Sequence, residues 1–237
     1  MLAIVLALSF STAEEFLKVV SARDVQAVQS MLATEPSLAE AHSAKGISAA
    51  FTAMFAIKKG EESFPDPKTN DVLQAILARK PKFGLFEVAA FGTAQQLEAL
   101  LRDDPKAAMS RTPFGWTPLH IAAFAGNVGT AEVLLAHGAE VNVRAQSKFR
   151  NTPLQTAMLT GQYATAKLLL DHGADLLVRQ AEGFTALHEA AQLGREDLVK
   201  LLLEHGAEIG SRADDGQTPL DIAVKGKHEG VVALLKK

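Results

Sequence analysis

Apolar residues recur along the C-terminal half of the chain in short clusters at a nearly constant spacing. The clusters occupy positions 133–135, 168–170 and 201–203. Leu198 precedes the last cluster by three positions, which is the spacing of one face of a helix. The pattern therefore predicts one amphipathic helix in each period.

A four-residue phrase repeats with the same period and marks the start of another helix. Each copy begins with Thr, whose hydroxyl can cap free N–H groups, and Pro usually follows in the first turn, where a missing donor costs nothing. Each period thus holds two helices. The copies are Thr117-Pro118-Leu119-His120, Thr152-Pro153-Leu154-Gln155, Thr185-Ala186-Leu187-His188 and Thr218-Pro219-Leu220-Asp221.

Glycines mark the predicted ends of both helices. One glycine stands nine positions after the Thr, between the helices, and a second follows the second helix, where a left-handed residue commonly ends a helix. Turn-forming residues then lead to the next Thr. The first set is Gly126, Gly161 and Gly194, and the second set is Gly138, Gly173 and Gly206.

A period of about 33 residues with this phrase and two helices resembles the ankyrin repeat. The resemblance is close over positions 112–237. It implies an all-α solenoid of L-shaped units, each a helix pair with a short β-hairpin finger. It also implies that the histidine of the phrase hydrogen-bonds backbone and ties neighbouring units together. The arrangement is similar to that of small stand-alone ankyrin-repeat proteins of the bacterial type.

The N-terminal half follows the same pattern in a degenerate form. A shift by two periods places Pro36 on Pro105 and Gly46 on Gly115. We therefore predict degenerate ankyrin-like repeats over positions 13–111 and regular ones over 112–237, in one continuous solenoid. About seven helix-turn-helix units begin near positions 13, 45, 81, 112, 147, 180 and 213.

Three departures from the period are visible. Residues 60–70 are too polar and too rich in Pro to continue a helix, so we predict an inserted loop, with Asn70 capping a helix over 71–79. The turn around Arg150 is two positions longer than its equivalents and has Arg150 where the others have Gly. In the last period, Gly226 arrives one position early.

The first ten residues are apolar except for Ser9 and have the length of a signal-peptide core, but no Lys or Arg precedes Lys18. Residues 1–12 are therefore a signal-like or unstructured N-terminus, or the start of a helix. We expect a cytoplasmic protein, and a secreted or periplasmic one if residues 1–10 act as a signal. No apolar run reaches the ~20 residues that span a bilayer.

Composition narrows the class of partner. The 40 Ala and 31 Leu favour closely packed helices over a β-sandwich. The absence of Cys excludes a disulfide scaffold and a Cys-ligated zinc site. A net charge of −3 gives no general attraction to nucleic acid or to an anionic membrane. We expect a monomer that binds another protein and needs no cofactor.

The histidines do not predict a metal or catalytic site. Five of the seven occupy repeat positions, and equivalent residues in a solenoid lie ~10 Å apart, too far to share one metal ion. The segment at residues 188–192 resembles the zinc motif H-E-x-x-H but ends in Gln192. No nucleotide-binding or hydrolase motif occurs, so we predict that the protein is not an enzyme.

The resemblance also implies where a partner binds. In the family, contacts fall on the residues before the Thr and on those before the glycine between the helices. These positions are rich in aromatic residues here, as binding hot spots are, although such rings can instead pack finger against finger. The candidates are Phe114, Trp116, Phe124, Phe149, Asn151, Leu159, Phe184, Gln192, Leu193 and Gln217.

We therefore expect a scaffold for protein–protein interaction that binds its partner in the concave groove of the solenoid. One alternative is a regulatory or inhibitory subunit that masks a partner enzyme, which would show as loss of the partner's activity. A third hypothesis is an enzyme with an unrecognised site, which pH-dependent turnover of a substrate would reveal.

Overall fold

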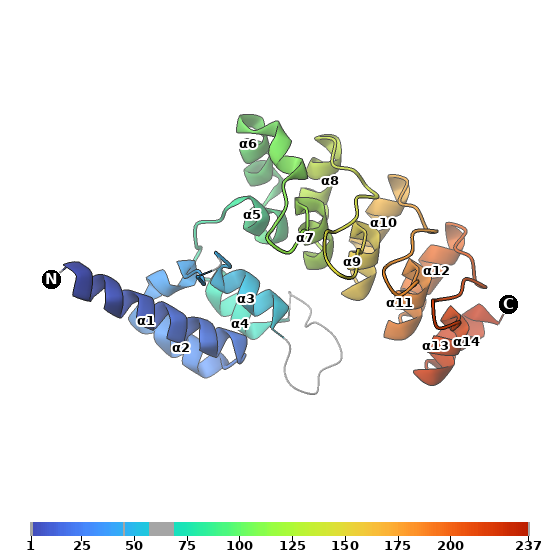
Figure 1. The fold of residues 1–237 in the computed structure, drawn as a ribbon, viewed down its shortest axis with the longest axis horizontal. Helices are drawn as coiled ribbons and strands as arrows, with labels where there is room; N and C mark the ends of the chain where they lie inside the picture. Colours follow the sequence, from blue (N-terminus) through green and yellow to red (C-terminus); the bar gives the residue numbers. More distant parts are fainter. Residues whose placement is uncertain (1, 45, 57–68, 237) are drawn as a thin grey trace. The chain divides into compact units, whose positions relative to one another are not determined.

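The computed structural model describes residues 2–44, 46–56 and 69–236, and helices form the regular secondary structure of that part of the chain (Figure 1). The chain divides into two compact units, Met1–Phe83 (unit 1) and Gly84–Lys237 (unit 2). The predicted continuous solenoid over residues 13–237 stays a prediction across this boundary, as does the number of repeats.

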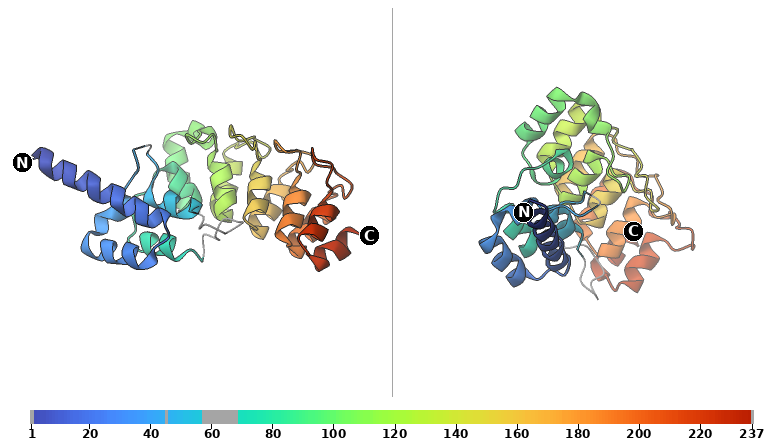
Figure 2. Two further views of the ribbon diagram at one scale, coloured as in Figure 1. Left: turned by 60° about the horizontal axis from the view of Figure 1, so that its bottom comes forward. Right: turned by 60° about the vertical axis from the view of Figure 1, so that its left-hand side comes forward.

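Unit 1 packs four α-helices around a small apolar core, in which Phe16, Val28, Met54 and Leu73 are buried. Its first helix begins at residue 2 and runs without a break (Figure 2), so the expectation of an unstructured start is wrong. The reason is local, because no Gly or Pro occurs before the end of this helix. The elements are α1 (Leu2–Ser21), α2 (Val25–Thr34), the 3-10 helix η1 (Pro36–Glu40), α3 (Ala49–Phe55) and α4 (Asp71–Leu77).

Asn70 joins the two halves of unit 1. Its side-chain oxygen accepts a hydrogen bond from the Leu73 N–H at 3.1 Å, which confirms the predicted cap of α4. Its side-chain nitrogen donates to the carbonyl of Ala53, near the end of α3, at 2.8 Å. Residues 57–68, which include most of the predicted loop at 60–70, lie outside the described residues.

Unit 2 stacks helix pairs in two rows (Figure 1). The first helices of the pairs pack on one another, α7 between α5 and α9 and α11 between α9 and α13, and the second helices form the other row. The pairs are α5 (Leu85–Phe91) and α6 (Ala94–Asp103), then α7 (Pro118–Ala125) and α8 (Val128–Ala136), α9 (Pro153–Leu159) and α10 (Tyr163–Asp171), α11 (Ala186–Leu193) and α12 (Glu196–Glu204), and α13 (Pro219–Lys225) and α14 (Glu229–Leu235), with the 3-10 helix η2 (Pro105–Met109) after α6.

The predicted glycine positions have the left-handed backbone that ends a helix. Gly126, between α7 and α8, has φ +71, and a Cβ there would collide with the side chain of Gln162 in the next pair. Gly138, Gly173 and Gly206 have φ of 82, 83 and 86. In the last pair Gly226 stays right-handed, and Lys227 takes the left-handed conformation instead.

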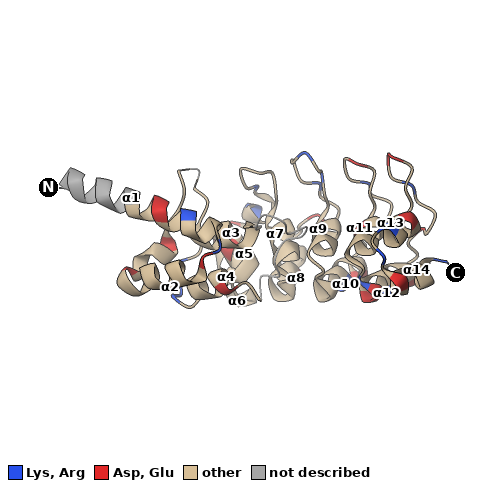
Figure 3. Cartoon of the chain, turned by 90° about the horizontal axis from the view of Figure 1, so that it is seen from below, with Lys and Arg blue, Asp and Glu red and all other residues tan. Residues whose placement is uncertain are grey.

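Four turns, which we call fingers 1 to 4, precede α7, α9, α11 and α13 and project on the same side of unit 2 (Figures 2 and 3). They span residues 112–116, 145–151, 180–184 and 213–217, and each is closed by a backbone N–H···O bond between its first and last residues, at 2.8 to 2.9 Å. No β-strand forms in the described residues, because each finger is too short to extend a ladder. Finger 2 has the two extra residues, and Arg150 adopts a left-handed backbone there.

Candidate protein-binding surface

Backbone hydrogen bonds fix the fingers to one another. Finger 2 donates the N–H of Gln146 to the carbonyl of Gly115 at 3.0 Å, and finger 3 donates the N–H of Ala181 to the carbonyl of Phe149 at 2.9 Å. Finger 4 repeats the contact with a bond of 3.1 Å to finger 3. The four fingers therefore present their tips in a fixed order.

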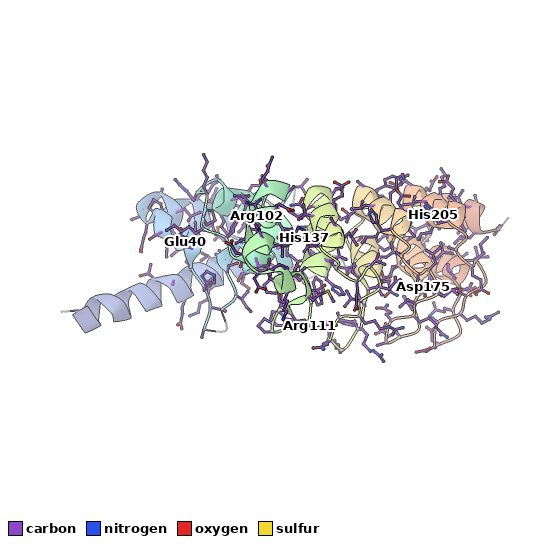
Figure 4. The ribbon with its side chains drawn as sticks, turned by 90° about the horizontal axis from the view of Figure 1, so that it is seen from above. Glu40, Arg102, Arg111, His137, Asp175 and His205 are labelled. Atoms are coloured by element: carbon purple, nitrogen blue, oxygen red, sulfur yellow. The ribbon has the colours of Figure 1, made fainter. Side chains whose placement is uncertain are left out.

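Four arginines form a ladder along the bases of the fingers, each directly before its finger. In fingers 1, 3 and 4 the guanidinium donates to the carbonyl of the finger's own glycine at 2.9 to 3.1 Å. Three of the arginines also donate to the backbone carbonyl of the next arginine, at 2.8 to 3.2 Å. Arg111 is seen among the finger turns in Figure 4. The ladder consists of Arg111, Arg144, Arg179 and Arg212.

Sequence reasoning missed this ladder, although its four arginines recur with the period of the repeat and so carried the signal. Arginine supplies several N–H donors in a rigid fork, which suits it to bridge two carbonyls in neighbouring units. Much of the positive charge near the fingers is thus engaged within the scaffold.

The histidine of the repeated phrase ties neighbouring pairs, as the family resemblance implied. His120 Nδ1 accepts the backbone N–H of Thr117 at 3.2 Å, so the ring proton lies on Nε2, which donates to the carbonyl of Asn151 at 2.9 Å. His120 is fully buried, and this burial lowers its pKa from 6.5 to about 4. The neutral ring is therefore the form that the fold requires.

Other residues fill the same position in the other pairs. Gln155 accepts the N–H of Thr152 and donates to two carbonyls of the next pair, at 3.0 and 3.1 Å. His188 donates to the carbonyl of Gln217 at 3.2 Å. Asp221 has only acceptor atoms and caps its own helix, through Thr218.

Two predicted contact residues are prominent on the fingers. Phe114, in finger 1, is 55% exposed, and Phe149, at the equivalent place in finger 2, is 44% exposed. The ammonium group of Lys148 lies 4.6 Å from the centre of the Phe149 ring, close enough for a cation–π contact. These rings are large apolar surfaces held in place by the scaffold.

Trp116 and Phe184 have a different role. Both are half-buried and stand directly before the Thr of their phrase. The Trp116 ring lies 6.1 Å from that of His120, and the Phe184 ring stacks on that of His188 at 5.2 Å. These rings shield the tying histidines from water, so part of their apolar surface belongs to the fold.

Two predicted contact residues are buried, and the expectation that they reach a partner is wrong. Phe124 has no exposed surface because it packs inside unit 2 against Trp116, with ring centres 5.5 Å apart. Asn151 is 6% exposed, because its carbonyl is drawn against α7 by the hydrogen bond from His120. Phe124 instead packs against the ring of Trp116 and helps to hold it in place.

The remaining candidates lie at solvent-accessible positions. Gln192 is exposed at the end of α11, whereas Leu193 and Leu159 are half-buried at the ends of their helices. The side chain of Gln217 is half-buried and donates to the carboxylate of Asp215 within finger 4. The structure therefore brings eight of the ten candidates to the fingers and to the ends of α9 and α11.

The histidines at the ends of the second helices serve as local links. His137 Nε2 lies 3.0 Å from a carboxylate oxygen of Glu98, and His205 Nε2 lies 3.7 Å from one of Asp171. Both histidines are labelled in Figure 4. Within the described residues, no group of three or more His, Asp or Glu side chains is placed to hold a metal.

Glu189, at the centre of α11, is an anomaly that sequence reasoning noted only as part of a failed zinc motif. It is 5% exposed, and its Oε2 has no hydrogen-bond partner. Burial raises its pKa well above the usual value. The equivalent residues of the other three phrases are Ile121, Thr156 and Ile222, which carry no charge.

Comparison with known proteins agrees with the geometry. A family model described as "Ankyrin repeats (3 copies)" matches residues 85–180 and 176–237, which is most of unit 2 and more than half of the chain. The chain is an ankyrin-repeat protein. No curated protein matches it.

Ankyrin repeats generally serve as protein–protein interaction modules, and the family is typically non-catalytic. Membership therefore gives this ankyrin-repeat protein a class of partner but no identity for it. Among its described helices, none combines the length and the apolar character needed to cross a bilayer.

Proposed function

We propose that this ankyrin-repeat protein binds a partner protein through its fingers and the adjoining ends of α9 and α11, without catalysing a reaction. The observation that carries the proposal is the exposure of Phe114 and Phe149 at equivalent positions on neighbouring fingers. Exposed aromatic residues on an otherwise polar surface are typical of binding hot spots.

The scaffold supports this proposal because the fingers are held before any partner arrives. The arginine ladder, the finger-to-finger backbone bonds and the tie from His120 leave little backbone freedom to lose on binding. A preorganised surface keeps more of its contact energy as affinity.

The test immobilises three forms of the full chain and exposes each of them to a lysate of the source cells. The forms are the wild type, the double variant Phe114→Ala with Phe149→Ala, and Tyr163→Ala. Tyr163 begins α10 in the other helix row and is 39% exposed, so it controls for loss of an exposed ring. We expect proteins retained by the wild type and by Tyr163→Ala, but lost by the double variant, to bind the purified wild type directly. Equal retention by all three baits would refute the proposal.

The same wild-type and variant proteins test the alternative that the chain is a regulatory subunit that masks a partner enzyme. Once a partner is purified, its activity is measured with and without the wild-type chain and with the double variant as control. Inhibition by the wild type alone would assign that more specific role.

A further inference from the structure

The finger tips change character along unit 2. The equivalent residues three places before the Thr are Phe114, Phe149, Glu182 and Asp215 in fingers 1 to 4. The first two are exposed aromatic rings, and the last two are exposed carboxylates. Acidic residues are seen at the tips of fingers 3 and 4 in Figure 3. A segment lying along the tips would therefore meet apolar surface first and negative charge next.

The acidic end keeps charge available to a ligand. Asp214 is paired with Arg179 at 3.0 Å, so those two charges offset each other. Hydrogen bonds from the backbone and side chain of Gln217 lower the pKa of Asp215, which keeps that carboxylate ionised. Lys225 is the further cation that acts on Asp215. The carboxylate of Glu182 has no hydrogen bond or ion pair within the described residues.

Glu189 supplies an independent sign of a ligand at the same end. It lies three and four positions before Gln192 and Leu193, so it shares their face of α11, on which Gln192 is exposed, Leu193 is half-buried and Glu189 itself is 5% exposed. A buried carboxyl with an oxygen that lacks a partner costs free energy in the isolated chain. A cationic side chain from a partner would supply the missing contact.

We propose that the partner segment carries an aromatic or aliphatic residue for fingers 1 and 2, followed along the surface by Lys or Arg side chains for Glu189, Glu182 and Asp215. This inference rests on the proposed function, because it names the chemistry of the partner at that same surface. Neighbouring helices pack about 8–10 Å apart, and an extended chain advances about 3.3 Å per residue. The basic residue at Glu182 therefore lies about three positions from the group on Phe149 and about six from the group on Phe114.

The test selects phage-displayed random dodecapeptides on the immobilised full chain and reads the enriched sequences. We expect Lys or Arg about three to six positions from an aromatic or aliphatic residue. Synthetic versions should bind at least tenfold more weakly to Glu182→Gln with Asp215→Asn, and to Glu189→Ile. Glu204→Gln, an exposed carboxylate on α12, should leave their affinity unchanged.

Glu189→Ile installs the residue found at positions 121 and 222, and Glu189→Gln keeps the shape of the side chain, so at least one should fold, as circular dichroism would show. Replacing Glu182 and Asp215 with Lys should shift selection toward acidic peptides. Peptides that need Phe114 and Phe149 but show no preference for basic residues would overturn this inference alone. If no selected peptide depended on those rings, or if the rings served only to join two copies of the chain, both this inference and the proposed function would be refuted.

Discussion

Two junctions of unit 2 are built at the same positions with different chemistry. The first junction joins the α7–α8 pair to the α9–α10 pair, where His120 donates to the carbonyl of Asn151. The second junction joins α9–α10 to α11–α12, where Gln155 donates to the carbonyls of Val178 and Phe184. The position demands a side chain that accepts at its near end and donates at its far end, and imidazole and amide both qualify. The choice between them decides whether a junction responds to pH.

A second difference lies at the turns after the second helices. Asn142 donates to the carbonyl of Gly173 at 3.3 Å and accepts from the N–H of Asp175 at 2.8 Å, which clamps the first junction. The equivalent residue at the second junction is Leu177, which has no such groups and is 67% exposed. The two junctions thus share apolar packing but differ in their polar links.

The largest expected effect tests the shared part. Leu134 and Leu169 are equivalent residues of α8 and α10, and both are fully buried. Replacing either with Ala should lower the free energy of unfolding by about 2–5 kcal/mol, since each leaves a cavity between neighbouring pairs. Urea unfolding of both variants measures this. A loss below about 1 kcal/mol at one site would show that the apolar packing of the two junctions is unequal.

The next largest expected effect distinguishes the two junctions by how their stability responds to pH. His120 has a pKa of about 4 in the folded chain against 6.5 as a free side chain, so the unfolded chain binds more protons between these values. The contribution of neutral His120 to the free energy of unfolding is fully present above pH 6.5. It is lost as the pH falls towards 4, by about 3 kcal/mol in total. His120→Gln should remove this loss and keep the tie, as Gln155 does. Urea unfolding at pH 7, 5 and 4 compares the two proteins.

The difference between the free energies of unfolding of the wild type and the variant isolates the titration of His120, because every other titratable group is present in both proteins. An identical acid response in the two proteins would mean that His120 is not kept neutral by the fold. The second junction supplies the matched control, since Gln155→Ala should weaken the protein by a similar amount at every pH.

A third prediction concerns Glu189, the buried carboxyl of α11. The raised pKa of Glu189 means that the folded chain holds its proton more tightly, so its contribution to stability declines as the pH rises above the ordinary Glu value of about 4.3. Glu189→Ile should raise the free energy of unfolding by about 1–3 kcal/mol at pH 7 and less at pH 4. Thermal unfolding across this pH range is the measurement. A variant less stable than the wild type at pH 7 would show that Glu189 has a stabilising partner.

The sequence predicted the features that recur in every repeat. It did not predict the roles of the residues that depart from the repeat. The period of Thr117 and its equivalents located the helix starts, and the glycines located the ends, because these depend on local backbone chemistry. The burial of Phe124 and Asn151 could not be predicted, since it depends on how Trp116 and His120 pack across the stack. The pattern placed these residues at contact positions but could not tell a ring that faces solvent from one beneath it.

Missed features fall into two kinds. The arginine ladder was present in the spacing of Arg111 and Arg144 but required knowing which carbonyls lie within reach. Glu189 was visible as an exception among uncharged equivalents, yet only the structure shows that its oxygen is buried without a partner. An exception at a buried repeat position is therefore visible in the sequence, but its packing and its partners are visible only in the structure.

The smallest expected effect would make the two junctions alike. Leu177→Asn places an amide where its side chain can donate to the carbonyl of Gly206 and accept from the N–H of Glu208, the equivalents of the partners of Asn142. Two new hydrogen bonds at an exposed turn should raise the free energy of unfolding by about 0.5–1.5 kcal/mol. Leu177→Ala is the control, because it removes the exposed leucine without adding a clamp. Urea unfolding that ranked Asn no higher than Ala would mean that the polar link contributes nothing, and that apolar packing alone holds both junctions.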